Sequence, residues 1–186
     1  MKRHSRVFSS LSILTVCAMM VAISVVLGWI GRTYFTFGGG SIRITFENLP
    51  IIFCGVTFGP VIGLIVGILS DLVSCLVAPQ PAVLPLITLG AGAVGFLSGA
   101  VARFLFKKKR KGLLCISFSA ISGHFVGSVI LKTVAICYYY SSPFWFTLIT
   151  RGITYIAICG AEIFLIWVIL KNREIVKIID DINGRG

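Results

Sequence analysis

The sequence predicts an all-α integral membrane protein, a bundle of six transmembrane helices. Of its 186 residues, 57% are hydrophobic and only 12% are charged, whereas soluble domains carry roughly 25% charged residues to keep their surface hydrated. The mean hydropathy of +1.01 points the same way. Lipid is therefore the expected solvent for most of the surface, and long apolar segments along the chain account for it.

Six apolar segments follow one another from end to end, and together they are expected to form a single domain over residues 1–186. Most of them reach the ~20 residues that a hydrocarbon core of ~30 Å requires. The first is too long for the core of a signal peptide, so it is expected to stay as a helix. The predicted helices are 7–30, 44–58, 61–78, 83–106, 113–139 and 144–170.

Charge decides whether 44–78 is one span or two. Gly59-Pro60 interrupts it, and proline lacks the N–H of a helix interior and clashes with the preceding turn. With a hairpin at this point, the basic N-terminus, the basic run 107–111 and the basic C-terminal segment all lie on one side, as cytoplasmic loops do. The sequence thus predicts a multi-pass plasma-membrane protein with both termini in the cytoplasm.

The remaining composition argues against several other classes. The 17 Lys and Arg against 6 Asp and Glu give a formal charge of +11, but the basic clusters follow the topology and indicate lipid contact, not nucleic acid. Six scattered cysteines without a C-x-x-C pair are interpreted as buried small hydrophobes, so no metal and no covalently bound cofactor is expected. The sequence has no G-x-x-x-x-G-K-[ST] nucleotide loop, and His124 is expected to be a satisfied interior histidine. We therefore predict that the chain is not an enzyme.

Five ionisable residues fall inside the predicted helices, where a charge marks a site or an ion pair. Asp71, Lys132 and Arg151 each lie seven residues from the outer end of their helix, or ~10 Å at 1.5 Å per residue. One carboxylate with two cations leaves an excess positive charge, which suits an anionic ligand entering from outside. The alternative is a structural ion pair of Asp71 with Lys132 or with Arg151. Glu162 and Arg103 lie deeper and are expected to neutralise each other.

Small residues four positions apart recur on several helices, and this spacing lets backbones approach closely. Packing within the bundle explains most of them, but part of this surface could dock another membrane protein, and spacing does not choose between the two. The pairs and runs are Ala18 with Ala22, Gly55 with Gly59, Gly63 and Gly67, and Gly95 with Gly99.

A series of motifs begins at Arg43. They are Arg43-Ile-Thr-Phe-Glu-Asn-Leu-Pro50, Gly55-Val-Thr-Phe-Gly-Pro60, Gly63-Leu-Ile-Val-Gly67, Asp71 and Thr88-Leu89, with a weaker continuation through Lys132-Thr133 to Arg151. This pattern resembles the substrate-binding S components of energy-coupling factor (ECF) vitamin transporters, and the folate type most closely. Two departures fall near the expected pocket: Lys132-Thr133 replaces a common Asn-Thr, and Glu47-Asn48 replaces Ser-Phe.

The resemblance implies a six-helix S-component fold and capture of a vitamin from outside. Transport would take place only in a complex with a transmembrane coupling subunit and two cytoplasmic ATPase subunits. It also implies that Ala18-x-x-x-Ala22 contacts the coupling subunit. The alternatives are an S component for another vitamin or a nucleobase-like precursor, a non-transporting membrane scaffold, and a stand-alone secondary transporter, which usually shows inverted repeats.

The implied ligand is folate or a similar flat, anionic, ring-bearing vitamin. In this interpretation Glu47 and Asn48 read the edge of a pterin ring, and Phe46 or Tyr139 stacks on its face. Asp71 completes the predicted site. The residues expected to attract carboxylates by charge-assisted hydrogen bonds are Arg32, Arg43, Lys132 and Arg151.

Overall fold

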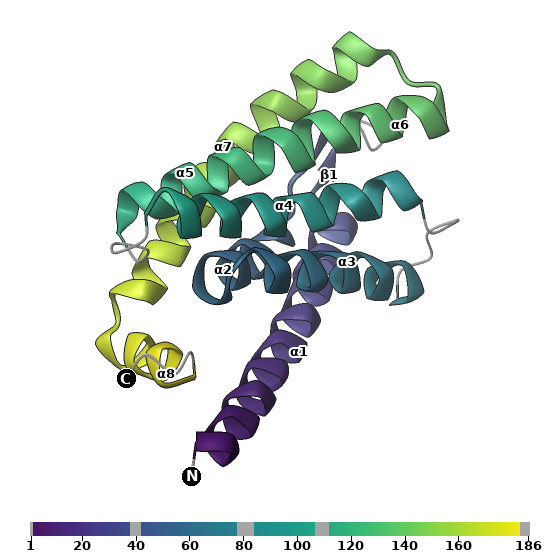
Figure 1. The fold of residues 1–186 in the computed structure, drawn as a ribbon. Coiled ribbons are helices and arrows are strands. Elements are labelled where there is room, and N and C mark those ends of the chain that lie inside the picture. The colour runs from purple at the N-terminus through teal and green to yellow at the C-terminus, as the bar shows by residue number, and fades with distance from the viewer. Residues whose placement is uncertain (1, 38–41, 78–83, 107–111, 183–186) are drawn as a thin grey trace.

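The computed structural model describes residues 2–37, 42–77, 84–106 and 112–182, and it is helical apart from one pair of two-residue strands (Figure 1). The strands are antiparallel and pair Thr36 with Arg43 and Phe37 with Ile42. The elements in chain order are α1 (Lys2–Tyr34), β1 (Thr36–Phe37), β2 (Ile42–Arg43), α2 (Asn48–Phe58), α3 (Pro60–Val77), α4 (Pro85–Phe104), α5 (Leu113–Gly123), the π-helix η2 (His124–Leu131), α6 (Lys132–Tyr140), α7 (Phe144–Lys171) and α8 (Arg173–Ile182).

The predicted break at Gly59-Pro60 is present, and it separates α2 from α3. Gly59 has a φ of 112°, a conformation that glycine adopts without steric cost. Pro60 then begins α3, at a helix start where its missing N–H leaves no bond unmade. The two helices therefore fold back on each other as a hairpin.

Helix α2 is the centre of the bundle. Nearly every residue from Asn48 to Phe58 is buried, which fits a helix that is apolar on all sides. At 11 residues it is only ~16 Å long, too short to cross a bilayer alone. Its first residue, Asn48, consequently begins the helix inside the bundle, with the other helices around it.

The hairpin packs against α4 through glycine. A Cβ added to Gly95 would lie 2.0 Å from the Gly63 carbonyl oxygen, and one added to Gly63 would lie 2.4 Å from the Gly95 oxygen. Only hydrogen fits between these backbones, so α3 and α4 are in direct main-chain contact. The predicted role of the small-residue spacing in internal packing is confirmed for Gly63 and Gly95.

Helices α5, η2 and α6 form one continuous span, which lies beside α7 and α4. Its middle is a π-helix over His124–Leu131. In this segment the Lys132 N–H donates to the Gly127 carbonyl, five residues back, and not to Ser128, the partner that an α-helix would use. This change of register has a direct consequence for the site described below.

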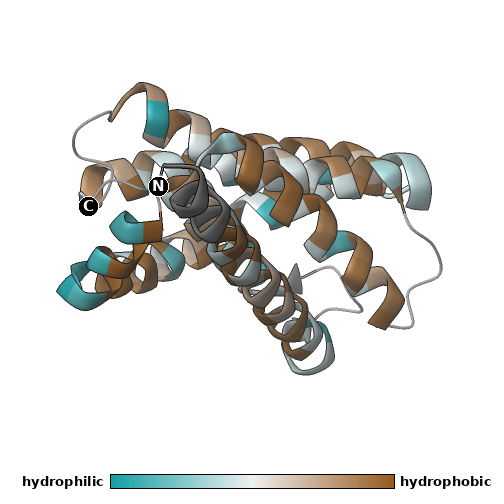
Figure 2. Cartoon of the chain, turned by 60° about the horizontal axis from the view of Figure 1, so that its bottom comes forward, coloured by the Kyte–Doolittle hydropathy of each residue, from teal (hydrophilic) through white to brown (hydrophobic). Residues whose placement is uncertain are grey.

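Five helical stretches of the described residues are long and apolar enough to cross a membrane. They are Leu11–Tyr34, Pro60–Val77, Pro85–Phe104, Leu113–Tyr140 and Phe144–Lys171, and the shorter apolar helix Asn48–Phe58 is the sixth. Hydrophobic residues, coloured brown in Figure 2, make up most of the helices, and large apolar side chains such as Leu76 (83% exposed) and Ile156 (77%) face outward. The predicted fold class, a membrane bundle of six apolar helices, is confirmed.

Helix α8 was not expected from the sequence. It is amphipathic, with the apolar side chains of Ile175, Ile179 and Ile182 packed into the core cluster and exposed Arg173 and Lys177 on the other side. It follows α7 and also contacts α1, which crosses the other helices at a steep angle (Figure 1). A helix of this kind is typical of a membrane surface or of the end of a bundle.

Candidate functional site

A polar pocket lies among α1, α2, α3, α4 and α6, next to the buried start of α2. Its volume is about 220 Å³, including the space at its opening. Polar side chains dominate the lining, which is unusual inside a bundle of apolar helices. The lining residues are Ser24, Arg32, Glu47, Asn48, Ile51, Ser70, Asp71, Ser74, Ala91 and Lys132.

Glu47 lines this pocket and is held by two cations. Arg32 Nη2 lies 3.3 Å from Oε2, and Lys132 Nζ lies 3.3 Å from Oε1. The backbone is fixed as well, because Ser24 Oγ donates a 2.6 Å hydrogen bond to the Glu47 carbonyl oxygen. Lys132 is only 5% exposed, so its charge needs this partner. Glu47 thus connects α1 to α6 across the pocket.

Asp71 stands on the α3 wall of the pocket and accepts a 2.7 Å hydrogen bond from Thr88 Oγ1 of α4. The salt bridges of the described residues do not include a pair between Asp71 and Lys132 or Arg151. The excess positive charge predicted for the layer of Asp71, Lys132 and Arg151 stays a prediction. Among the described residues that line the pocket, the cations Arg32 and Lys132 are matched by the carboxylates Glu47 and Asp71.

Arg151 does not line the pocket but is fixed next to it by the π-helix. Its Nε and Nη2 donate to the Ser128 carbonyl oxygen at 3.3 and 3.2 Å. This oxygen is accessible to a side chain because the Lys132 N–H bonds to Gly127 instead. Arg151 also contacts Tyr155, through a 3.3 Å hydrogen bond to its hydroxyl and with the guanidinium carbon 5.3 Å from the ring centroid.

The deep carboxylate has a different partner from the one predicted. Glu162, fully buried on α7, pairs with His124 Nε2 at 2.5 Å, and His124 Nδ1 lies 3.3 Å from Ser128 Oγ. Arg103, by contrast, has an exposed side chain at the end of α4. The predicted neutralisation of Glu162 by Arg103 is therefore wrong. The expectation of a satisfied interior histidine at His124 is confirmed, with Glu162 and Ser128 as the partners.

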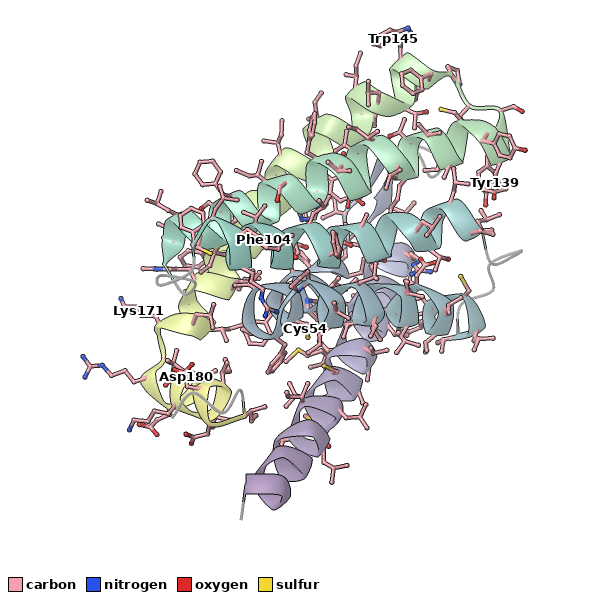
Figure 3. All side chains as sticks on the ribbon, viewed as in Figure 1. Cys54, Phe104, Tyr139, Trp145, Lys171 and Asp180 are labelled. Atoms are coloured by element: carbon pink, nitrogen blue, oxygen red, sulfur yellow. The ribbon has the colours of Figure 1, made fainter. Side chains whose placement is uncertain are left out.

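The other predicted site residues lie elsewhere. Phe46 is partly buried but does not line the pocket, and the side chain of Arg43 is outside the part of the chain that the structure describes. Tyr139 packs edge-on against Tyr138, two helical turns and ~10 Å beyond Lys132 along α6. Figure 3 shows Tyr139 and Trp145 at the end of the bundle opposite Lys171 and Asp180. Five predicted residues therefore share the pocket: Arg32, Glu47, Asn48, Asp71 and Lys132.

Three buried polar atoms at the pocket have no hydrogen-bond partner. They are Arg32 Nε, Asn48 Oδ1 and Ser70 Oγ, and they make up three of the five such side-chain atoms among the described residues. Buried polar atoms in native proteins are nearly all paired with protein groups, ligands or ordered water, so these three atoms mark where a polar ligand or water would bind in the pocket. Within the residues that the structure describes, no group of three or more His, Cys, Asp or Glu side chains could hold a metal ion.

A family model described as "ECF transporter, substrate-specific component" matches residues 13–179, a range that runs from within α1 to within α8 and includes every residue of the pocket. No curated protein matches the chain.

Proposed function

The chain belongs to the substrate-specific components of energy-coupling factor (ECF) transporters, and on this premise we propose that the pocket around Glu47 captures folate or a similar ring-bearing vitamin from outside the cell. Members of this family are substrate-binding subunits of a transport complex embedded in the membrane. The observation that carries the proposal is the group of unpaired polar atoms Arg32 Nε, Asn48 Oδ1 and Ser70 Oγ in one pocket. Such atoms are satisfied when a polar ligand enters.

The charges of the lining support a ligand with an acidic group and a hydrogen-bonding ring. An entering carboxylate would compete with Glu47 for Arg32 and Lys132 and form charge-assisted hydrogen bonds with them. Asn48 and Asp71 would then meet the polar edge of the ring. We assign the carboxylate-binding role to Arg32 and Lys132. Arg151 does not line the pocket in this assignment, and its guanidinium stays bonded to the Ser128 carbonyl oxygen.

A smaller ligand is the second candidate, and the size of the pocket favours it. The pocket measures only about 220 Å³ even with the space at its opening included, so the enclosed part that could hold a ligand is smaller still. A nucleobase-like precursor needs less space than folate, and a lining with equal numbers of cations and carboxylates suits an uncharged ring. In this candidate Glu47 keeps both of its cations, and Asn48, Ser70 and Asp71 bind the ring.

Calorimetric titration of the purified chain separates these candidates. We expect saturable binding of folate, with free nucleobases and the other B vitamins at least tenfold weaker. Tighter binding of a nucleobase than of folate would select the second candidate. A chain that binds no member of the panel, and whose melting temperature no member raises, would instead be a membrane scaffold without a ligand.

Transport also needs partners, and we propose that the free face of α1 contacts the coupling subunit of a complex with two cytoplasmic ATPase subunits. Only 17% of the Leu11–Tyr34 span is buried, and Ala18 and Ala22 are both exposed on it. Small side chains on an exposed transmembrane face allow close approach of a partner helix.

Replacing both alanines with leucine (Ala18→Leu with Ala22→Leu) is expected to abolish vitamin uptake by cells while the purified chain keeps its affinity within about twofold. The added side chains prevent backbone approach but are not part of the pocket lining. Uptake of radiolabelled folate and copurification of the ATPase subunits measure the effect. Ala157→Leu, at an exposed alanine of α7, is the matched control. Equal loss of binding and uptake would mean that the two alanines pack the chain itself.

We also propose that the chain lies in the plasma membrane with both termini on the cytoplasmic side, because the basic clusters then share that side. The clusters at 107–111 and at the two termini include residues outside those that the structure describes. Among the described residues, Lys171 lies at the end of the bundle opposite Trp145 (Figure 3), and the exposed Arg173 and Lys177 follow it in α8. Reporters fused after Arg110 and after Arg173 should both read as cytoplasmic. An external signal after Arg110 would contradict this orientation.

A further inference from the structure

A chain of four buried polar side chains leads from the pocket wall into the bundle. Asn48 Nδ2 donates to Ser128 Oγ at 3.4 Å, Ser128 Oγ lies 3.3 Å from His124 Nδ1, and His124 Nε2 lies 2.5 Å from Glu162 Oε2. All four are at least 97% buried, with exposed fractions of 0%, 0%, 3% and 0%. The binding role proposed above uses only the first of them, Asn48.

The donors and acceptors that each side chain offers determine where the protons lie along this row of hydrogen bonds. A serine hydroxyl has one proton to donate, and a neutral histidine donates from one ring nitrogen and accepts at the other. If Glu162 is ionised, it accepts from His124 Nε2, which leaves Nδ1 as an acceptor. Ser128 must then donate to Nδ1, and its oxygen accepts from the Asn48 amide nitrogen. The amide oxygen Oδ1 is left for the pocket, where it has no partner in the protein.

Charge balance favours this proton arrangement. Arg151 brings one positive charge to the same cluster, through the Ser128 carbonyl and through Tyr155, whose ring centroid lies 5.2 Å from that of His124. With Arg151 charged, Glu162 ionised and His124 neutral, the cluster has no net charge. Protonation of either His124 or Glu162 would leave an uncompensated positive charge at membrane depth, which is costly.

We propose, on the premise that the pocket binds a vitamin as described above, that Glu162, His124 and Ser128 are positioning residues that fix the amide of Asn48 with its oxygen toward the ligand. The site then selects a ring that presents an N–H donor at this point and discriminates against the same ring without it. A buried acceptor that is left unpaired penalises the wrong ligand, and this is how polar sites reach high selectivity.

The proton arrangement can be tested without any ligand. The chain has two histidines, so a His4→Gln variant labelled with ¹⁵N-histidine reports on His124 alone. In lipid nanodiscs at neutral pH we expect a protonated Nε2 and an unprotonated, hydrogen-bonded Nδ1. Ser128→Ala should shift the Nδ1 resonance, whereas Ser119→Ala, at another fully buried serine of the same span, should not. A protonated Nδ1 would overturn the proposal.

Selectivity tests the consequence for binding. The probes are folate and its 3-deaza analogue, in which a C–H replaces the N–H at ring position 3. The wild-type chain should prefer folate by about 3- to 10-fold, the range of one neutral hydrogen bond. Ser128→Ala and Asn48→Leu should bring this ratio close to one, and Ser119→Ala should leave it unchanged.

The two readouts have separate meanings. A ratio that survives Ser128→Ala would overturn the positioning role, since loss of packing alone weakens both probes equally. If neither probe binds but other ligands do, the choice of folate fails, and the histidine spectrum still decides whether the amide of Asn48 is fixed as proposed. A melting temperature measured for each variant excludes unfolding as the cause of a lost ratio.

Discussion

Replacing Lys132 with methionine is expected to weaken binding of an anionic vitamin by about 10- to 100-fold, the range of one charge-assisted hydrogen bond at ~1.5–3 kcal/mol. Methionine keeps most of the length of the side chain but removes the ammonium group that lies 3.3 Å from Glu47. Among the described lining residues, Arg32 is then the remaining cation and Glu47 and Asp71 are the two carboxylates, which gives a net negative charge. A ligand carboxylate loses a donor and meets repulsion as well, whereas an analogue without a carboxylate loses much less.

Three companion variants make this result interpretable. Lys132→Met combined with Glu47→Gln restores the charge balance and should recover thermal stability but not the affinity for the anion. Asp71→Asn keeps an acceptor for Thr88 and removes a competing charge, so anion affinity should stay the same or rise. Lys171→Met, at an exposed lysine, is the control. Unchanged anion affinity with a lower melting temperature in Lys132→Met would show that Lys132 and Glu47 form only a structural ion pair.

The outline of the bundle could be predicted because its signals are local. A run of apolar residues of bilayer length defines a span wherever its neighbours lie, and Gly59-Pro60 ends one helix and begins the next through its own backbone geometry. Helix α8 gave no such signal. Its 10 residues are too few and too polar to count as a span, and its place is set by contacts with α1 and α7, which are distant in the sequence or come from another helix.

The residues that lie in the site could be predicted better than the ion pairs and hydrogen bonds between them. Depth along the helices placed Asp71 and Lys132 in one layer, and both line the pocket. Spacing gives a direction but no partner, because the residue opposite comes from a different helix. Glu162 was therefore paired with Arg103 when its partner is His124. Glu47 was predicted to bind the edge of the ligand ring, and its ion pairs with Lys132 and Arg32 were not predicted. Lys132 is 85 residues and Arg32 is 15 residues from Glu47 in the sequence, so helical spacing could not connect them.

The π-helix is a further feature that sequence reasoning could not supply. No residue in His124–Leu131 requires a wider turn, yet that turn gives the Ser128 carbonyl to Arg151 and keeps this cation out of the pocket lining. A regular α-helix would have retained the bond from Lys132 N–H to Ser128. The predicted layer of two cations and one carboxylate rested on regular helices, and it did not foresee that the Arg151 guanidinium bonds to the Ser128 carbonyl oxygen.

The largest effect on stability is expected from Gly95→Ala. The new methyl carbon would lie 2.0 Å from the Gly63 carbonyl oxygen and 2.4 Å from its carbonyl carbon, and both are backbone atoms that cannot rotate away. Helices α3 and α4 must therefore separate, and we expect a loss of about 3 kcal/mol, at the upper end of overpacking effects, or a fall in melting temperature of about 10 °C. Ligand affinity should fall too, because α3 and α4 carry Asp71 and its partner Thr88.

Gly160→Ala is the matched control for this prediction. A Cβ at Gly160 would meet no atom within 4 Å, and alanine is the better helix former by about 1 kcal/mol, so the melting temperature should stay the same or rise slightly. The melting temperatures of both purified variants are measured by thermal unfolding in the same detergent. If Gly95→Ala melts as Gly160→Ala does, then α3 and α4 are farther apart in the membrane than these contacts require. The pocket, which α3 and α4 both line, would then be larger than the structure shows, and the size argument for a small nucleobase-like ligand would lose its basis.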